Sequence, residues 1–253
     1  MNNKTSKLIC GYGFVGKAQH KLFPDSSIFD SNSINSIPYP IEKYDICFVC
    51  VGTPIKEDGS CDTSAVFDVI NNVSADLFII RSTVVPGTTN RLNGIKPCVF
   101  QPDYIGETVA HPLLDESQTK FVILGGLENL TDKAIEVYKE VYNSSVRFIQ
   151  LTGLEAEICK YLENVSIATT VTLMNTFYEI CEVLGANYNK VREAYLADPR
   201  MSRYFTFVYP DKRGFNGKCI PKDVSSIYGA AKEYGFDSIF IKGILEQNKQ
   251  WQR

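Results

Sequence analysis

A glycine-rich turn near the N-terminus places the strongest constraint on the fold of this chain. Gly11-Tyr-Gly-Phe-Val-Gly16 follows an apolar run at Lys7–Cys10 and precedes a helical pattern. In such a turn the first glycine permits the sharp bend, the second lets the backbone approach a pyrophosphate, and the third lets helix and strand pack closely. Amide groups at the helix start would then face the phosphates. A glycine-rich turn that binds no dinucleotide is the alternative.

An acidic residue favours the dinucleotide interpretation. Asp30 ends the second predicted strand, about 20 residues after the turn, where a carboxylate is expected to accept hydrogen bonds from the adenosine ribose hydroxyls. A carboxylate there repels a 2′-phosphate, so we expect NAD rather than NADP. The candidate cofactor residues of this region are Gly11, Gly13, Phe14, Val15, Gly16 and Asp30.

The first half of the chain alternates short apolar runs with helical patterns, which predicts a doubly wound parallel sheet with crossover helices. The predicted strands are Lys7–Cys10, Ser27–Asp30, Asp45–Val51, Leu77–Arg81, Pro97–Phe100, Phe121–Leu124 and Val146–Ile149. The predicted helices between them are Phe14–Phe23, Thr63–Val73 and Thr131–Tyr142.

The pattern changes at Gly153, after which helical periodicity dominates. A long helix without proline or internal glycine is predicted from Leu154 to about Leu184, ending at Gly185. Further helices are predicted at Asn189–Leu196, Lys222–Tyr234 and Ser238–Gln250. We therefore expect an α/β domain at residues 1–152 and an all-helical domain with one long central helix at residues 153–253.

Composition excludes several classes of function. The chain has 253 residues and a net charge of −3, with no long basic block, so a nucleic-acid or membrane-surface partner has no electrostatic support. We find neither a secretory signal nor a segment as long as a membrane span. The eight cysteines show no paired metal-knuckle spacing, so we expect no metal site, reduced thiols and a cytoplasmic setting.

One cysteine stands out by its surroundings. Cys219 lies in Gly214-Phe-Asn-Gly-Lys-Cys-Ile-Pro-Lys-Asp223, among glycines, two lysines and an aspartate. Nearby cations favour the thiolate, which is the reactive form. A turn thiol without a reactive role is the alternative. By contrast, Cys47 and Cys50 lie in an apolar run, where cysteine behaves as a small hydrophobe.

The long helix carries a second candidate pair. Lys160 and Asn164 are four residues apart and therefore project from the same helix face. A lysine and an amide that point together into a cleft can hold an alkoxide or an oxyanion. The alternative is a solvated helix face.

Six segments taken together resemble the UDP-glucose/GDP-mannose dehydrogenase family. They follow the family's order and spread over nearly the whole chain. They are Gly11–Gly16, Cys50-Val-Gly-Thr-Pro54, Ser82-Thr-Val-Val-Pro-Gly87, Gln101-Pro-Asp-Tyr-Ile-Gly-Glu107, the Lys160/Asn164 helix and Gly214–Asp223.

This resemblance implies a Rossmann-like NAD-binding domain, a helical central domain that mediates homodimerisation through its long helix, and a nucleotide-sugar substrate. It implies that a primary alcohol is oxidised to a carboxylate with two NAD, through a thiohemiacetal and a thioester on the cysteine. The implied catalytic residues are Cys219, Lys160, Asn164, Asp223, Thr83, Asp103 and Glu107. The implied NAD contacts are Val15, Asp30, Thr53, Thr83, Glu107 and Lys222, and the implied substrate contacts are Lys160, Asn164, Arg200 and Gly214.

The chain departs from the family pattern at several positions. Asp103 replaces a usual glutamate, which shortens the side chain by one methylene, and Lys218 stands beside the cysteine. Lys218 either lowers the thiol pKa further or is simply exposed to solvent. The chain ends at Arg253, about where family members continue into a second α/β domain that binds the substrate nucleotide.

Two other functions stay open at the level of sequence. A β-hydroxyacid dehydrogenase shares a Rossmann domain followed by a helix with lysine and asparagine, but it needs no cysteine and makes one hydride transfer. A nucleotide-sensing or assembly module would keep the fold without the chemistry.

Overall fold

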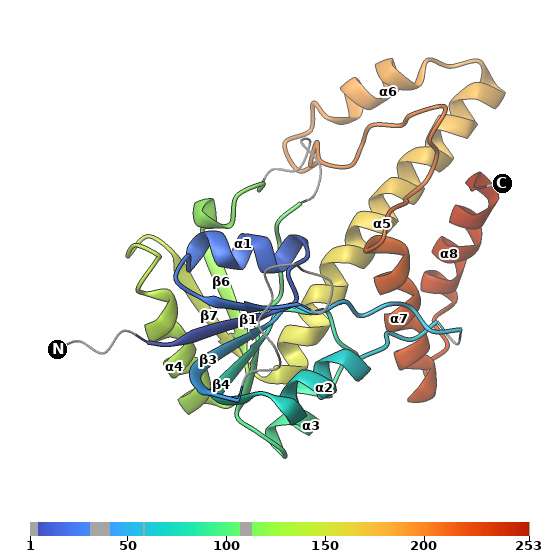
Figure 1. Cartoon of the computed structure of the whole chain (residues 1–253). Coiled ribbons are helices and arrows are strands. Elements are labelled where there is room, and N and C mark those ends of the chain that lie inside the picture. The colour runs from blue at the N-terminus through green and yellow to red at the C-terminus, as the bar shows by residue number, and fades with distance from the viewer. Residues whose placement is uncertain (1–4, 31–40, 58, 107–112, 253) are drawn as a thin grey trace. The chain divides into compact units, whose positions relative to one another are not determined.

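The computed structural model describes residues 5–30, 41–57, 59–106 and 113–252 (Figure 1). The chain forms two compact units, each described here by itself. Unit 1 comprises Met1–Lys56 and Cys61–Lys160, and unit 2 comprises Glu57–Ser60 and Tyr161–Arg253. The division that we expect near residue 153 stays a prediction.

Unit 1 is built on one sheet with the strand order β2-β1-β3-β4-β5-β6-β7. The strands β1 to β5 pair in parallel throughout, which confirms the predicted α/β class. Their bounds are Lys7–Cys10 for β1, Ser27–Phe29 for β2, Lys43–Val49 for β3, Ser74–Ile80 for β4 and Cys98–Phe100 for β5. The remaining two are β6 at Phe121–Gly125 and β7 at Arg147–Leu151.

The sheet differs from the all-parallel prediction at one pair of strands. β5 and β6 are antiparallel, with Phe100 opposite Gly125, whereas β6 and β7 are again parallel. Among the described residues, the connection between β5 and β6 contains only the short 3-10 helix η1 at Glu116–Gln118. A parallel pair needs a crossover connection, so a chain that returns without one enters the next strand in the opposite direction.

Helices cover both faces of the sheet. Leu8 packs in a cluster with Val66, Val69 and Ile70 of α2, whereas its neighbour Ile9 packs with residues of α1 and α4. Successive strand residues point to opposite faces, so the sheet is doubly wound, as predicted. The helices are α1 at Phe14–Leu22, α2 at Ser64–Asn72, α3 at Thr88–Asn93 and α4 at Glu128–Tyr138.

Unit 2 contains helices and loops, without a strand of the sheet among its described residues. The long helix α5 spans Gly153–Leu184, within one residue of the prediction, and ends at Gly185, whose φ is 72°. It is followed by α6 at Tyr188–Tyr195, α7 at Ile220–Glu233 and α8 at Ile239–Trp251. Ala168, Phe215, Val224 and Ile244 form the core of this unit. None of the helices in the described ranges combines the length and the apolar character that crossing a membrane requires.

A buried carboxylate fixes the first turns of α5 within unit 1. Glu157 is fully buried and accepts hydrogen bonds from the Gly87 amide at 2.5 Å, the Thr89 amide at 2.7 Å and the Thr89 hydroxyl at 2.6 Å. These amides lie at the start of α3, where backbone donors lack partners within the helix. Burial raises the pKa of Glu157 above its ordinary value, while the three donors oppose that rise. The start of α5 is thereby tied to the loop that follows β4.

We expect Glu157→Gln to destabilise unit 1. The glutamine amide keeps only one acceptor oxygen, and its NH₂ group would face the backbone amides of Gly87 and Thr89, which are donors themselves. The expected loss in the free energy of unfolding is about 2 kcal/mol, the cost of leaving a buried polar group unpaired. Urea unfolding followed by circular dichroism measures it. Glu136→Gln, at an exposed residue paired with Lys139, is the control and should change stability by less than about 0.5 kcal/mol. Equal effects of the two substitutions would contradict the anchoring role.

Candidate active site

The turn after β1 is a tight backbone cradle. Gly11 has a φ of 91°, and a Cβ there would lie 2.6 Å from the Cys50 carbonyl oxygen. A Cβ on Gly16 would lie 1.9 Å from the Gly11 carbonyl oxygen, so α1 can begin this close to the strand only with glycine. A Cβ on Gly13 would meet nothing within 4 Å, which leaves open space beside the turn. These positions fit the predicted pyrophosphate cradle.

Asp30 lies beside this cradle. Its carboxylate accepts a hydrogen bond from the Tyr12 amide at 2.5 Å, so the acid is fixed against the backbone of the turn. α1 begins at Phe14, whose side chain is exposed, and Val15 follows it in the first turn. The predicted turn residues and the predicted acid therefore lie together, in the arrangement that recognises a ribose next to a pyrophosphate.

Two threonines meet at the same edge of the sheet. The Thr53 hydroxyl donates to the Thr83 carbonyl oxygen at 2.8 Å, and the neighbouring Ser82 hydroxyl donates to the Val51 carbonyl oxygen at 2.6 Å. These segments follow β3, which pairs with β1, and β4, which pairs with β3. The strand order reverses direction at β1, and ligands of such sheets bind at the carboxyl ends of the strands around that point.

The segment after β5 carries Asp103 next to a buried ion pair. The guanidinium of Arg81 is fully buried and lies 2.6 Å from a Glu116 carboxylate oxygen and 3.7 Å from Asp103 Oδ1. Asp103 Oδ1 also accepts a hydrogen bond from the Ile105 amide at 3.1 Å. Burial raises the pKa of Glu116, and the positive charge of Arg81 opposes that rise.

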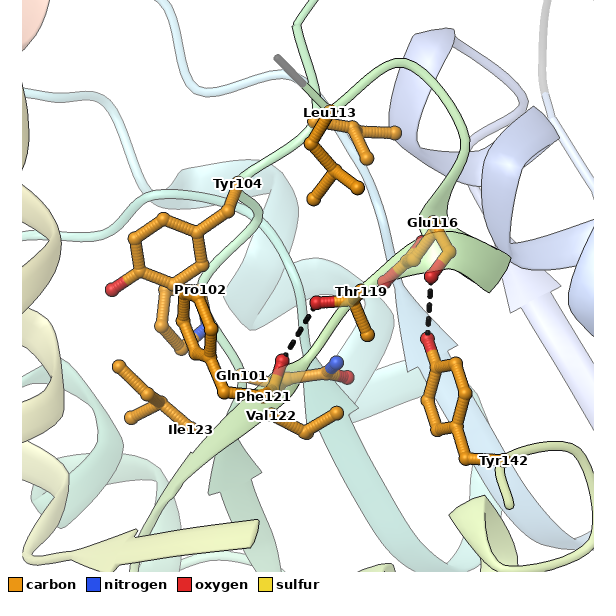
Figure 2. Close-up of a pocket in the computed structure, with 11 residues that line it drawn as sticks. Gln101, Pro102, Tyr104, Leu113, Glu116, Thr119, Phe121, Val122, Ile123 and Tyr142 are labelled. Carbon is orange, nitrogen blue, oxygen red and sulfur yellow. Dashed lines mark hydrogen bonds between the residues drawn. The ribbon is translucent and has the colours of Figure 1, made fainter. Parts of the chain in front are cut away.

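A small cavity lies beside this segment (Figure 2). Its volume is about 20 Å³, which is room for roughly one water molecule. Gln101, Tyr104, Glu116 and Tyr142 are among the residues that line it. The cavity is too small to hold a sugar, so we assign it no ligand.

Lys160 lies in α5, as predicted, at the end of unit 1. Its Nζ is 5.0 Å from the centre of the Tyr104 ring. The Tyr104 hydroxyl lies 3.7 Å from the sulfur of Cys159, the residue before the lysine. Tyr104 is therefore a neighbour of two candidate catalytic residues, Asp103 and Lys160. Glu107 lies outside the described residues.

In unit 2 a buried network joins three of the predicted residues. The Asn164 amide nitrogen of α5 donates to Asp223 Oδ2 of α7 at 2.5 Å, and Lys222 Nζ lies 2.7 Å from Asp223 Oδ1. Asn164 and Asp223 are almost fully buried. The carboxylate therefore orients both an amide and an ammonium, the two kinds of donor that can stabilise an oxyanion.

Cys219 precedes α7 directly, one helical turn before Asp223. The Cys219 side chain is exposed, whereas Cys47, Cys50 and Cys98 are buried, and burial raises the pKa of the Cys98 thiol to about 12. A helix N-terminus favours negative charge. Cys219 is thus exposed to solvent at the N-terminus of α7, and its role as a reactive thiol stays a prediction.

Sequence reasoning missed two asparagines that hold the loop before Cys219. Asn248 of α8 accepts from the Phe215 amide at 2.8 Å and donates to the Phe215 carbonyl oxygen at 2.9 Å. Asn175 of α5 accepts from Arg213 Nε at 2.5 Å and from the Gly214 amide at 3.3 Å. Both asparagines are buried. A single asparagine in a helical pattern has no spacing that marks it, so no signal in the sequence identifies them.

The two remaining predicted substrate residues have local contacts in unit 2. Gly214 has a φ of 72°, and a Cβ there would lie 2.3 Å from Asn248 Oδ1, so glycine is required for the loop itself. The Arg200 side chain is 81% exposed and pairs with both carboxylate oxygens of Asp198. Their contact with a substrate stays a prediction.

The fold and the cradle define a dinucleotide-binding α/β protein. Residues 31–145 match the NAD binding domain of the UDP-glucose/GDP-mannose dehydrogenase family, and residues 154–250 match the central domain of the same family. The chain belongs to this family, and the prediction of NAD as cofactor is confirmed by the matching domain.

Individual proteins show the same relationship. The UDP-glucose 6-dehydrogenase of Rickettsia typhi is 29% identical over 219 residues, which cover 81% of this chain and 49% of that protein. The chain thus spans about half the length of the curated relatives that it matches.

Solved structures confirm the fold. A UDP-glucose dehydrogenase from Pyrobaculum islandicum superposes with a TM-score of 0.83 at 24% identity, over 98% of this chain and 68% of that one. The 3-hydroxyisobutyrate dehydrogenase of Mycobacterium tuberculosis superposes with a TM-score of 0.72 at 14% identity, over 97% of this chain and 93% of that one. At sequence identities this low, the superpositions show a shared fold and nothing about function.

We expect Asn248→Ala to loosen the loop that leads to Cys219, because the Phe215 amide and carbonyl lose their partners inside the unit. The free energy of unfolding should fall by about 2 to 3 kcal/mol, and the Phe215 amide should exchange its hydrogen faster. Urea unfolding and hydrogen exchange followed by mass spectrometry measure the two effects. Gln250→Ala, at an exposed position of the same helix, is the control. Unchanged exchange at Phe215 would show that Asn248 does not hold the loop.

Proposed function

We propose that this chain catalyses the NAD-dependent oxidation of the C6 primary alcohol of a UDP-glucose-like nucleotide sugar to a carboxylate, with Cys219 as nucleophile. The observation that carries the proposal is the arrangement at the start of α7. An exposed cysteine there is followed one turn later by Asp223, which binds both Asn164 and Lys222. Membership of the family supports the same reaction class.

The residues around β1 fit NAD. The Gly11–Gly16 turn would hold the pyrophosphate, Asp30 the adenosine ribose, and Thr53 and Thr83 the cofactor at the ends of β3 and β4. When bound, NAD accepts a hydride in each of two oxidations, so that one alcohol yields two NADH. Val15 and Lys222 are proposed as further contacts from the family pattern, as is Glu107.

Cys219 makes a direct four-electron oxidation possible by holding the intermediate. After the alcohol has become an aldehyde, the thiolate adds to the carbonyl carbon, and protonation of the oxygen gives a thiohemiacetal. The second oxidation removes hydride from that carbon and the proton from that oxygen, which leaves a thioester. Water then attacks the thioester, the carbon–sulfur bond breaks, and the thiolate is restored with the carboxylate as product. This is covalent catalysis by an activated thiol.

The other polar residues have proposed roles in the same reaction. Lys160 and Asn164 would donate hydrogen bonds to the oxygen that becomes negative when the thiolate or water adds. Asp223 would orient Asn164 and Lys222, as its buried contacts allow. Thr83 and Asp103 would position and activate the water that cleaves the thioester. The side chain of Asp103 is one methylene shorter than that of glutamate, and its length sets how far the carboxylate reaches toward this water. Arg200 and Gly214 are the proposed contacts of the nucleotide sugar.

We also propose that the chain pairs with a second copy through α5. Apolar side chains of this helix fall into two groups, since Ala168 and Val165 pack inside unit 2 while Leu162 and Leu173 are 63% and 45% exposed. Phe177 continues the exposed set at 47%. Exposed apolar side chains at helical spacing are typical of a helix-packing face.

We propose a cytoplasmic setting for the protein. All eight cysteines lie outside disulfides, which supports this proposal because reduced thiols are typical of the cytoplasm.

We expect Cys219→Ala to lower acid formation from UDP-glucose by at least about thousandfold, because the variant lacks the thiol that is proposed to trap the aldehyde. NAD binding should be unchanged, since the cofactor cradle lies in unit 1. Product analysis by mass spectrometry and calorimetric titration with NAD measure the two quantities. Cys181→Ala, which removes a buried thiol of the same unit, is the matched control.

Full turnover to the acid without the Cys219 thiol would contradict the proposal. One NADH per substrate, with or without the thiol, would instead indicate a single oxidation of the β-hydroxyacid dehydrogenase type. NAD binding without turnover of any nucleotide sugar would indicate a module that keeps the fold for binding alone.

A further inference from the structure

Tyr104 lies between two candidate catalytic groups of unit 1. It follows Asp103 directly in the segment after β5, and its ring lies under the ammonium of Lys160, with 5.0 Å from Nζ to the ring centre. The face of an aromatic ring carries negative charge density and attracts a cation within about 6 Å. The contact therefore joins the segment that carries the acid to the helix that carries the lysine.

The ring of Tyr104 is fixed at both ends. It packs edge-to-face on Phe121 at the start of β6, with ring centres 5.2 Å apart and planes at 62°. At the other end its hydroxyl lies 3.7 Å from the sulfur of Cys159. In Figure 2 the hydroxyl points away from the side of the cavity where Glu116 and Tyr142 lie. Rotating the ring away from Lys160 would break both contacts.

The segment that carries Tyr104 is also held through its neighbour Asp103. Asp103 faces the fully buried guanidinium of Arg81 at 3.7 Å, and Arg81 is paired with Glu116 at 2.6 Å. A displacement of this segment would disturb a buried ion pair, which is strongly destabilising. Asp103 thus contacts Arg81 while Tyr104 contacts Lys160, and each contact restrains the position of the neighbouring residue.

We propose that Tyr104 is a positioning residue for Lys160. Its ring face holds the ammonium at a set place above the segment that bears Asp103, so the lysine is oriented before the substrate arrives. A lysine side chain otherwise samples many rotamers, and donors stabilise an oxyanion best when they are already aimed at it. The catalytic consequence rests on the proposed role of Lys160, whereas the contact itself does not.

A matched pair of substitutions separates the ring from the hydroxyl. Tyr104→Phe keeps the ring face and removes the hydroxyl that contacts Cys159, so kcat for NADH release should stay within about twofold. Tyr104→Leu removes the ring face, and kcat should fall about tenfold, equal to about 1.4 kcal/mol in the barrier, with KM for NAD unchanged. If circular dichroism shows Tyr104→Leu to be unfolded, Tyr104→Met takes its place because methionine adapts to irregular spaces.

A second readout detects the contact without any turnover. Reductive methylation with ¹³C-formaldehyde labels the lysine amines and keeps their charge, and Lys160→Arg identifies the Lys160 signal in the NMR spectrum. The ring current should shift this signal upfield in the unsubstituted chain and in Tyr104→Phe, and the shift should disappear in Tyr104→Leu. Lys17, whose Nζ lies 5.9 Å from the centre of the Tyr12 ring, is the internal control and should not change.

The NMR signal and kcat test different parts of the proposal. A Lys160 signal that does not move in Tyr104→Leu overturns the proposal, whatever the activity. A signal that moves while kcat for the nucleotide sugar stays unchanged overturns the positioning role. An unsubstituted chain that oxidises no nucleotide sugar refutes the proposed function, and the NMR signal then still decides whether Tyr104 holds Lys160.

Discussion

The parallel pairing of β1 to β5 is the constraint on which the candidate site of unit 1 depends. Parallel strands end at the same edge of a sheet, so the segments that follow them leave that edge together. The glycine turn follows β1, Asp30 follows β2, Thr53 and Thr83 follow β3 and β4, and Asp103 follows β5. Hydrogen bonds within this edge, such as that between Thr53 and Thr83, then fix the individual segments.

The antiparallel pair at β5 and β6 has its own consequence. Because Phe100 faces Gly125, the start of β6 lies beyond the end of β5, beside the segment that carries Asp103 and Tyr104. Phe121 can therefore support the Tyr104 ring. Glu157 ties the first turns of α5 to the start of α3, which places Lys160 over that ring. The antiparallel pair and the buried Glu157 together bring Lys160 to the segment that carries Asp103.

Much of this was predictable from particular residues. The glycine turn, the apolar run before it and Asp30 identify the cofactor cradle because their spacing follows from backbone geometry. The long helix is predictable because no proline or glycine interrupts residues 154–184. The antiparallel pair is not predictable because apolar runs do not record strand direction, and α3 is not because six residues are too few for a helical period. Asn248 and Tyr104 act through tertiary contacts, which single-residue patterns do not contain.

We propose both the cofactor site and the thiol chemistry for a family member that spans about half the length of its curated relatives. The most direct measurement is NADH release from the unsubstituted chain with NAD and a panel of UDP- and GDP-sugars, with the acid product quantified in the same reactions. We expect at least one sugar of the panel to yield two NADH for each carboxylate formed. Calorimetrically confirmed NAD binding without NADH release from any of these sugars would show that the chain does not catalyse this oxidation.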